Sequence, residues 1–305
     1  MQPSRSLLAL PVVLGLACGG NVVGTDRAML AAMQVPPEAG VAVSDVELKV
    51  VEIRRDDNTR HKSLSVRFEV AGEGLKKYRP GVKYSCVVGE VVLTGGFVAY
   101  GNSPVDGKLA PEILFIELDD YLRSTGSDEP SACELDLRLE ENGPPVPGRE
   151  QRPLGKLCYR QLDGKRALAE GACAGDVVPR APQPDATLTA KIVSARPTNG
   201  GNAESTSVIF GSLLTLHRPA GAGLSVTIAS SCDGVPGQVT LGPNHFEDVA
   251  PGESIWHRGT QPTPGKAAGE TKQCDLTIRA KEGETSAEVA RSCYRTGTLT
   301  DGACG

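Results

Sequence analysis

The stretch that decides the fold is Cys158-Tyr159-Arg160, followed by Gly171-Ala172-Cys173, because it occurs twice. Cys293-Tyr294-Arg295 is likewise followed by Gly302-Ala303-Cys304, close to the end of the 305-residue chain. Upstream of each copy stands a matching segment, CELDLR from Cys133 and CDLTIR from Cys274. The repeat predicts two homologous halves.

Nine cysteines divide into four in each half and one remainder, Cys18, near the start. An even set in matching order predicts a disulfide framework in an oxidising compartment. A structural zinc site would need closer spacings between cysteines or histidines. The eight cysteines expected to form disulfides are Cys86, Cys133, Cys158, Cys173, Cys232, Cys274, Cys293 and Cys304.

Four cysteines allow three pairings in each half, and the sequence alone does not choose among them. We favour first with second and third with fourth, because the third and fourth are close in sequence and the segment between them contains turn-forming Gly and Asp. A loop of about 15 residues closed in this way stabilises by roughly 3 kcal/mol relative to the unfolded chain. Such disulfides add stability to a core that is poor in aromatic residues, which make up 4% of the chain.

The first eighteen residues predict a signal peptide, with Arg5 followed by an apolar run from Leu7 to Ala17. This run is shorter than the roughly 20 residues of a membrane-spanning helix. The sequence Leu14-Gly15-Leu16-Ala17-Cys18 resembles the lipobox of bacterial lipoproteins, although the family usually has Leu three places before the cysteine. Gly15-x-Ala17 also suits ordinary signal peptidase, which would leave Cys18 a free thiol and the protein secreted.

The lipobox resemblance implies that Cys18 is acylated and becomes the new N-terminus. The membrane is then a partner, because several acyl chains on one cysteine give a firm anchor. By the sorting habits of that family, Gly19 after the cysteine implies the outer membrane, with the protein on its periplasmic face or at the cell surface.

The mature chain predicts an all-β fold. Apolar and polar residues alternate in about seven short segments per half, for example from Leu64 to Val70, which is typical of half-buried strands. This pattern resembles the immunoglobulin-like class, without the Trp expected between its core cysteines, and implies two tandem antiparallel β-sandwich domains with two disulfides each. The boundaries expected are a signal peptide (1–18), a tether (19–43), a first sandwich (44–174), a proline-rich linker (175–186) and a second sandwich (187–305).

Three local expectations follow from the same segments. The tether can form a short helix from Asp26 to Met33, ended by Pro36-Pro37. A strand is predicted over Ile113–Leu118. Prolines in the linker favour an extended conformation, which predicts two domains spaced apart.

Few residues are candidates for chemistry. His245 and His257 lie near Glu247, Asp248 and Glu253, a residue set that could bind a metal ion. Asp119-Asp120 are candidate calcium ligands, although we favour a solvated, turn-forming acidic run. Trp256, the single tryptophan, belongs either to a core or to an exposed anchor for a partner.

The repeated Tyr-Arg pairs, Tyr159-Arg160 and Tyr294-Arg295, fit ordinary packing beside a disulfide. A formal net charge of -5 disfavours a nucleic-acid partner, since no basic field exists to attract phosphates. No motif for a cofactor or an activated nucleophile is present.

The function expected from these observations is that of a non-enzymatic cell-envelope lipoprotein acting as a binding or structural accessory module. Its partner would be a protein or a glycan, contacted through the loops Arg54–Lys62 and Gly242–Lys272. The alternatives are a metal-dependent hydrolase using His245, His257 and nearby carboxylates, and an extracellular protease inhibitor.

Overall fold

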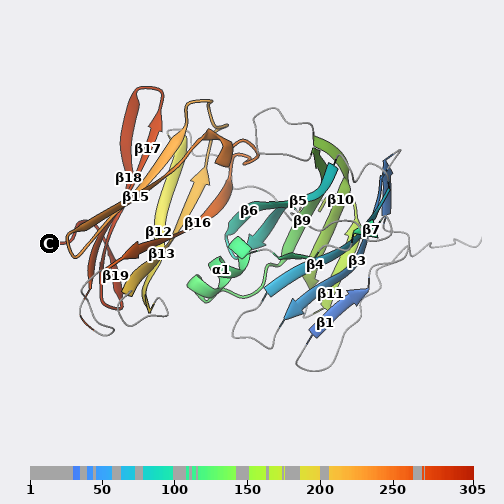
Figure 1. Cartoon of the computed structure of the whole chain (residues 1–305), viewed down its shortest axis with the longest axis horizontal. Coiled ribbons are helices and arrows are strands. Elements are labelled where there is room, and N and C mark those ends of the chain that lie inside the picture. Colours follow the sequence, from blue (N-terminus) through green and yellow to red (C-terminus); the bar gives the residue numbers. More distant parts are fainter. Residues whose placement is uncertain are drawn as a thin grey trace, which may run out of the picture.

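The computed structural model describes residues 30–34, 40–43, 46–56, 63–72, 78–98, 108–109, 112–114, 116–141, 151–162, 165–173, 175, 186–199, 206–263, 270 and 272–305. Within these ranges the chain is mostly β-strand, with a single α-helix, α1 (Ile116–Thr125) (Figure 1). The predicted signal peptide with Cys18, most of the linker and part of the tether lie outside the described residues.

The strands of the first half lie in two sheets. The six-stranded sheet contains β1 (Leu30–Gln34), β2 (Gly40–Val43), β3 (Val46–Asp56), β4 (Ser63–Ala71), β7 (Lys108–Leu109) and β8 (Glu112–Leu114). The other sheet contains β11 (Lys165–Glu170), β10 (Gln151–Leu162), β9 (Ala132–Glu141), β5 (Tyr78–Val88) and β6 (Val91–Val98), in this order.

The strands of the second half repeat this arrangement. A five-stranded sheet runs in the order β15 (Val235–Leu241), β14 (Ser225–Cys232), β17 (Gln273–Glu282), β18 (Thr285–Arg295) and β19 (Thr298–Asp301). Three further strands are β12 (Leu188–Asn199), β13 (Thr206–Leu216) and β16 (Glu253–Pro262).

The two halves share one strand order. In both, the cysteine-bearing strands β5 and β14 pair with the next cysteine-bearing strands β9 and β17, and each is followed by a hairpin partner, β6 or β15. The sequence repeat is therefore a repeat of topology. It makes β6 of the first half the counterpart of β15 in the second.

Alternation of side chains produces a separate core in each half. In β9, Cys133, Leu135, Leu137 and Leu139 are all buried, whereas the residues between them face the other side of the sheet. They pack with Tyr84 and its neighbours from β5. The second core gathers buried residues from both of its sheets, among them Ile192, Phe210, Ile228, Leu276, Ile278 and Tyr294.

Four disulfides join the cysteines in the favoured pattern, two within each half: Cys86–Cys133, Cys158–Cys173, Cys232–Cys274 and Cys293–Cys304. Cys86 lies directly opposite Cys133 in the β5–β9 register, and Cys232 directly opposite Cys274 in the β14–β17 register. These bridges indicate an oxidising compartment, extracellular or periplasmic.

Two local expectations were wrong. Leu30–Gln34 forms strand β1, because its backbone pairs with β3, so the helix predicted over Asp26–Met33 does not form at its last four positions, and its first four positions lie outside the described residues. The strand predicted over Ile113–Leu118 ends at Leu114 and gives way to α1.

The reason α1 forms lies in the spacing of its apolar residues. Leu118, Tyr121 and Leu122 follow a helical period and are all buried. Glu117 and Asp119 in the first turn and Arg123 in the last turn complement the helix dipole. Gly126 follows with a φ of 68°, a left-handed conformation that suits glycine after a helix.

The disulfide closing the shorter loop of the first half gives a stability test. Replacing Cys158 and Cys173 together by Ala should lower the free energy of unfolding by about 3 kcal/mol, because the unfolded chain regains the freedom of a loop of about 15 residues. Urea denaturation of the oxidised proteins measures this. Ser286→Ala, an exposed change, should have almost no effect. Peptide mapping of unreduced protein that joined one half to the other would contradict the architecture.

Candidate functional site

The two halves meet along β16, which continues a sheet of the first half. Glu253 and Ser254 of β16 pair in parallel with Val92 and Leu93 of β6, and β13 pairs on the other side of β16. The result is an eight-stranded sheet in the order β11-β10-β9-β5-β6-β16-β13-β12 (Figure 1). The prediction of spaced domains was therefore wrong, because a strand of one half completes the sheet of the other.

A buried aromatic contact joins α1 to β16. Trp256 Nε1 donates a hydrogen bond of 3.0 Å to Asp120 Oδ2, and its ring meets that of Tyr121 edge-on with centroids 5.3 Å apart. Arg258 Nη1 lies 3.4 Å from the other oxygen of Asp120. A Cβ atom on Gly211 would stand 2.0 Å from the Trp256 ring, so only glycine leaves room for the indole there. Trp256 is thus part of the core of the first half, supplied by the second.

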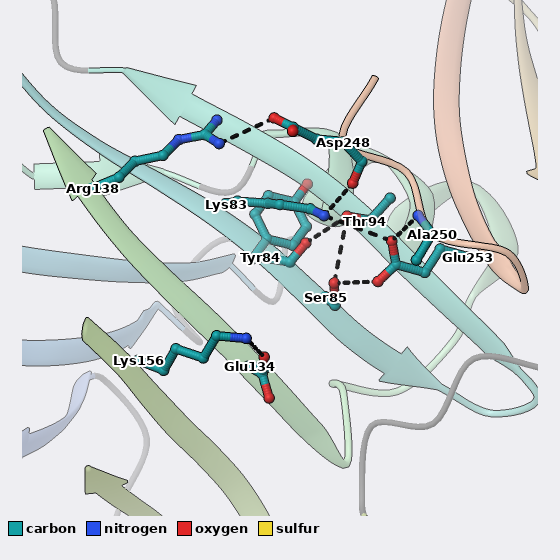
Figure 2. A network of polar contacts seen from close by, with 10 residues as sticks. All are labelled: Lys83, Tyr84, Ser85, Thr94, Glu134, Arg138, Lys156, Asp248, Ala250 and Glu253. Atoms are coloured by element: carbon teal, nitrogen blue, oxygen red, sulfur yellow. Dashed lines mark hydrogen bonds and ion pairs between the residues drawn. The ribbon is translucent and has the colours of Figure 1, made fainter. Parts of the chain in front are cut away.

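A polar network joins the outer face of β5 and β9 to the segment that leads into β16 (Figure 2). Lys83 Nζ donates to the carbonyl oxygen of Asp248. Arg138 Nη1 donates to Asp248 Oδ2 over 3.0 Å, and its Nε lies 3.0 Å from Glu140 Oε1. Asp248 is therefore held by two cationic side chains of the first half.

Glu253 is the buried member of this network, with 5% of its surface exposed. Its carboxylate accepts hydrogen bonds from Ser85 Oγ at 2.6 Å and from the Ala250 backbone N–H at 2.9 Å. Lys83 Nζ lies 3.9 Å from it. Because a buried charge is costly unless paired and hydrogen-bonded, these partners are what allow Glu253 to sit at the strand junction.

A cavity of about 170 Å³ opens beside the network. Its lining includes Lys83, Thr94, Arg138, His245, Asp248 and Ile255. The two cations in the lining already face the carboxylates of Asp248, Glu140 and Glu253, so no excess positive charge is left to attract an anion. The arrangement is suited to holding the halves together.

The histidines do not complete a metal site. His245 ends the short 3-10 helix η2 (Pro243–His245) and is exposed, whereas His257 lies in β16 opposite Ser212. In the part of the chain that the structure describes, no three His, Cys, Asp or Glu side chains converge closely enough to hold a metal ion. The ligand set suggested by the sequence, with Glu247, Asp248 and Glu253, is all within that part.

Burial lowers the pKa of His257, and the nearby charge of His245 lowers it further. The Nε2 atom of His257 is buried and has no hydrogen-bond partner among the described residues. The neutral imidazole is thus the form that the native structure accommodates.

The acidic pair Asp119-Asp120 also differs from expectation. It lies in α1 and not in a turn, and Asp120 is 5% exposed. Asp120 serves Trp256 and Arg258 as an acceptor, and no acidic cluster suited to a metal ion surrounds it within the described residues.

In the repeated Tyr-Arg pairs, the two tyrosines have a structural role. Tyr159 and Tyr294 are both fully buried beside the disulfide cysteines that precede them. The Tyr294 hydroxyl accepts a hydrogen bond from the Gly297 backbone N–H at 3.1 Å, which fixes the turn between β18 and β19. Arg295 is exposed.

Comparisons with known proteins identify no family. No protein-family profile and no curated protein matches the sequence significantly. Among solved structures, one match is a β-glucuronidase 2 from Bacteroides uniformis, bound to cyclophellitol-6-carboxylate aziridine, at 11% identity and a TM-score of 0.22. The match covers 77% of this chain and 26% of the enzyme. A likeness this weak supports no conclusion about fold or activity.

The junction residues were not found from the sequence. Lys83 and Arg138 carry no motif, and Asp120 is in the sequence only a candidate calcium ligand, so their place in the junction is shown by their contacts across the halves. The segment Gly242–Lys272, which is predicted to supply a recognition surface, also supplies part of the junction through Asp248 and Glu253.

Asp120 provides a test of the junction. Asp120→Ala should lower the free energy of unfolding by about 2–3 kcal/mol, because the buried indole N–H and the Arg258 guanidinium lose their acceptor. Asp120→Asn keeps one acceptor oxygen and should lose less. Equilibrium urea unfolding measures both, with Glu247→Ala as the exposed acidic control. Equal losses for Asn and Ala at position 120 would contradict the acceptor role.

The burial of His257 predicts that the stability of the protein depends on pH. The pKa of His257 is lower in the native state than in the unfolded chain, where it is about 6.5. The stability that the neutral side chain contributes is therefore fully present above about pH 6.5. It is lost as the pH falls from about 6.5 through the native pKa. His257→Gln should therefore flatten the decline in melting temperature between about pH 7 and pH 5. Exposed His245, replaced by Gln, is the control and should change the slope much less. An unchanged slope in His257→Gln would count against the buried neutral imidazole.

Proposed function

We propose that this protein is a non-enzymatic cell-envelope lipoprotein, anchored through Cys18, whose two halves are immunoglobulin-like β-sandwiches that act as a binding or structural accessory module. One observation carries the anchor: the other eight cysteines pair within their own halves, which leaves Cys18 as the one cysteine outside the disulfides. An unpaired thiol in an oxidising compartment is a liability unless it is modified. Acylation of the Cys18 thiol would remove this liability.

A binding or structural role fits the way the halves are held. Disulfides, a shared sheet and the Asp120–Trp256 contact make a rigid scaffold, and rigid scaffolds commonly carry recognition on their loops. In the described residues no helix is long and apolar enough to cross a membrane. We place the attachment to the outer membrane on the acyl chains of Cys18.

The anchor is tested by Cys18→Ala in the organism that makes the protein. Wild type should fractionate with membranes and carry a lipid on the peptide that begins at Cys18, whereas the variant should be soluble after osmotic release, because it has no acyl chains. Mass spectrometry of the N-terminal peptide and fractionation measure this. Cys18→Ser is a second control that rules out an effect specific to Ala.

Two results would overturn the anchor. One is an unmodified Cys18 thiol in the mature wild-type protein. The other is membrane association that survives removal of Cys18 in both variants. The accessory role is tested separately by crosslinking in intact cells, where wild type with no crosslinked partner of any kind would contradict it.

A further inference from the structure

Strand β15 forms one edge of the five-stranded sheet. It pairs with β14 on one side, and no described strand pairs with its other side. Its counterpart in the first half, β6, has the same place in the strand order, yet β16 covers the outer side of β6. The repeat therefore presents the same edge twice, once paired with a strand and once without a strand partner among the described residues.

The composition of β15 sets it apart from the other edge strands of the eight-stranded and five-stranded sheets. An exposed edge strand is normally protected by charges, by proline or by its shortness. Strand β11 contains Lys165, Arg166 and Glu170, β12 contains Lys191 and Arg196, and β19 has only four residues. Strand β15, with the sequence VPGQVTL, has no charged residue. Its one protective residue, Pro236, lies near its start.

The direction of the backbone groups of β15 follows from the hairpin. The turn Asp233-Gly234 has φ values of 48° and 83°, typical of a two-residue hairpin loop. The Asp233 N–H donates to the Gln273 carbonyl at 2.8 Å, so the odd-numbered residues of β14 bond toward β17 and the even-numbered ones toward β15. Their partners Val235, Gly237 and Val239 consequently use their own backbone groups on β14.

The backbone groups of the alternate residues point away from β14. The outward N–H groups are those of Gln238 and Thr240, and Pro236, which has none, loses nothing by facing outward. Gln238 and Thr240 lie symmetrically on either side of Val239. An antiparallel copy of the same strand, related by a two-fold axis at Val239, would place each Gln238 opposite a Thr240.

Val239 itself is unusual in its exposure. It is 36% exposed, and among the described residues it is the large hydrophobic side chain that stands out as exposed. It lies in register with the buried Ile228, so it faces the core side of its sheet, but it stands on the edge strand. A copy of Val239 across a two-fold axis would cover it.

We propose that the outer edge of β15 is an interaction surface for a second copy of this chain, which pairs antiparallel across a two-fold axis at Val239. Gln238 and Thr240 of each copy then exchange four backbone N–H···O=C hydrogen bonds, with no like charges opposed. The contact is isologous and closes at a dimer. It depends on strand β15 and not on the fate of Cys18.

Val239→Cys tests the register of this pairing. Residues directly opposite in a pair without mutual hydrogen bonds have Cα atoms about 4.5 Å apart, which a disulfide can bridge. The purified full chain should therefore form a disulfide-linked dimer under mild oxidation. Lys191→Cys, on the charged edge β12, is the matched exposed control and should not. Equal crosslinking of both variants would overturn the proposal, as would the absence of a disulfide-linked dimer of Val239→Cys.

Val239→Lys tests the energy of the contact. Two lysines opposed at the axis should weaken the dimer by about tenfold or more in Kd, measured by sedimentation equilibrium of the full chain in detergent. Thr285→Lys adds the same charge at an exposed position opposite Glu282, away from β15, and should leave Kd unchanged. Equal melting temperatures show that both variants are folded.

Two outcomes of the sedimentation measurement would contradict the proposed dimer. A wild-type chain that stays monomeric up to several hundred micromolar would show that the edge does not pair. A dimer that Val239→Lys leaves intact would place the contact elsewhere, including a head-to-tail arrangement in which a strand of the next copy takes the place that β16 takes on β6.

Discussion

Two cross-strand disulfides, each buried between two neighbouring inner strands of its sheet, are the constraint on which the rest of the structure depends. Cys86–Cys133 and Cys232–Cys274 each join residues directly opposite in register, with Cα atoms 4.0 Å apart. A slip of one residue would turn every side chain of the strand to the wrong face. With few aromatic residues to specify packing, the bridges fix which face of each sheet becomes core.

The junction between the halves is different in kind. It relies on a short parallel pairing, a Trp256 side chain donated across the boundary, and charged groups that neutralise one another. Exposed ion pairs such as Arg138–Asp248 contribute little, about 0–1 kcal/mol each. The buried Trp256–Asp120 contact and the hydrogen-bonded Glu253 therefore carry most of the specificity, because leaving either unpartnered would be costly.

Local patterns in the sequence predicted the all-β class, the repeat and the disulfide pairing, since alternation and cysteine order are properties of neighbouring residues. They failed where the outcome depended on distant segments. The apolar residues of Ile113–Leu118 fit a strand, but Tyr121 and Leu122 extend them at helical spacing and α1 forms. In the sequence, Asp248 and Glu253 are candidate metal ligands beside His245 and His257, and only the fold brings Lys83, Ser85 and Arg138 to them.

The duplication also explains why the halves differ at equivalent edges. In the first half, β6 gains β16 as a neighbour, and the loop leading into β16 places Asp248 and Glu253 against β5 and β9. In the second half, no described strand pairs with the outer side of β15, so its outward backbone groups have no strand partner among the described residues. An edge inherited by duplication but left without its neighbour is protected by charge, proline or brevity, or is covered by a partner, and the uncharged seven-residue β15 has only Pro236 near its start.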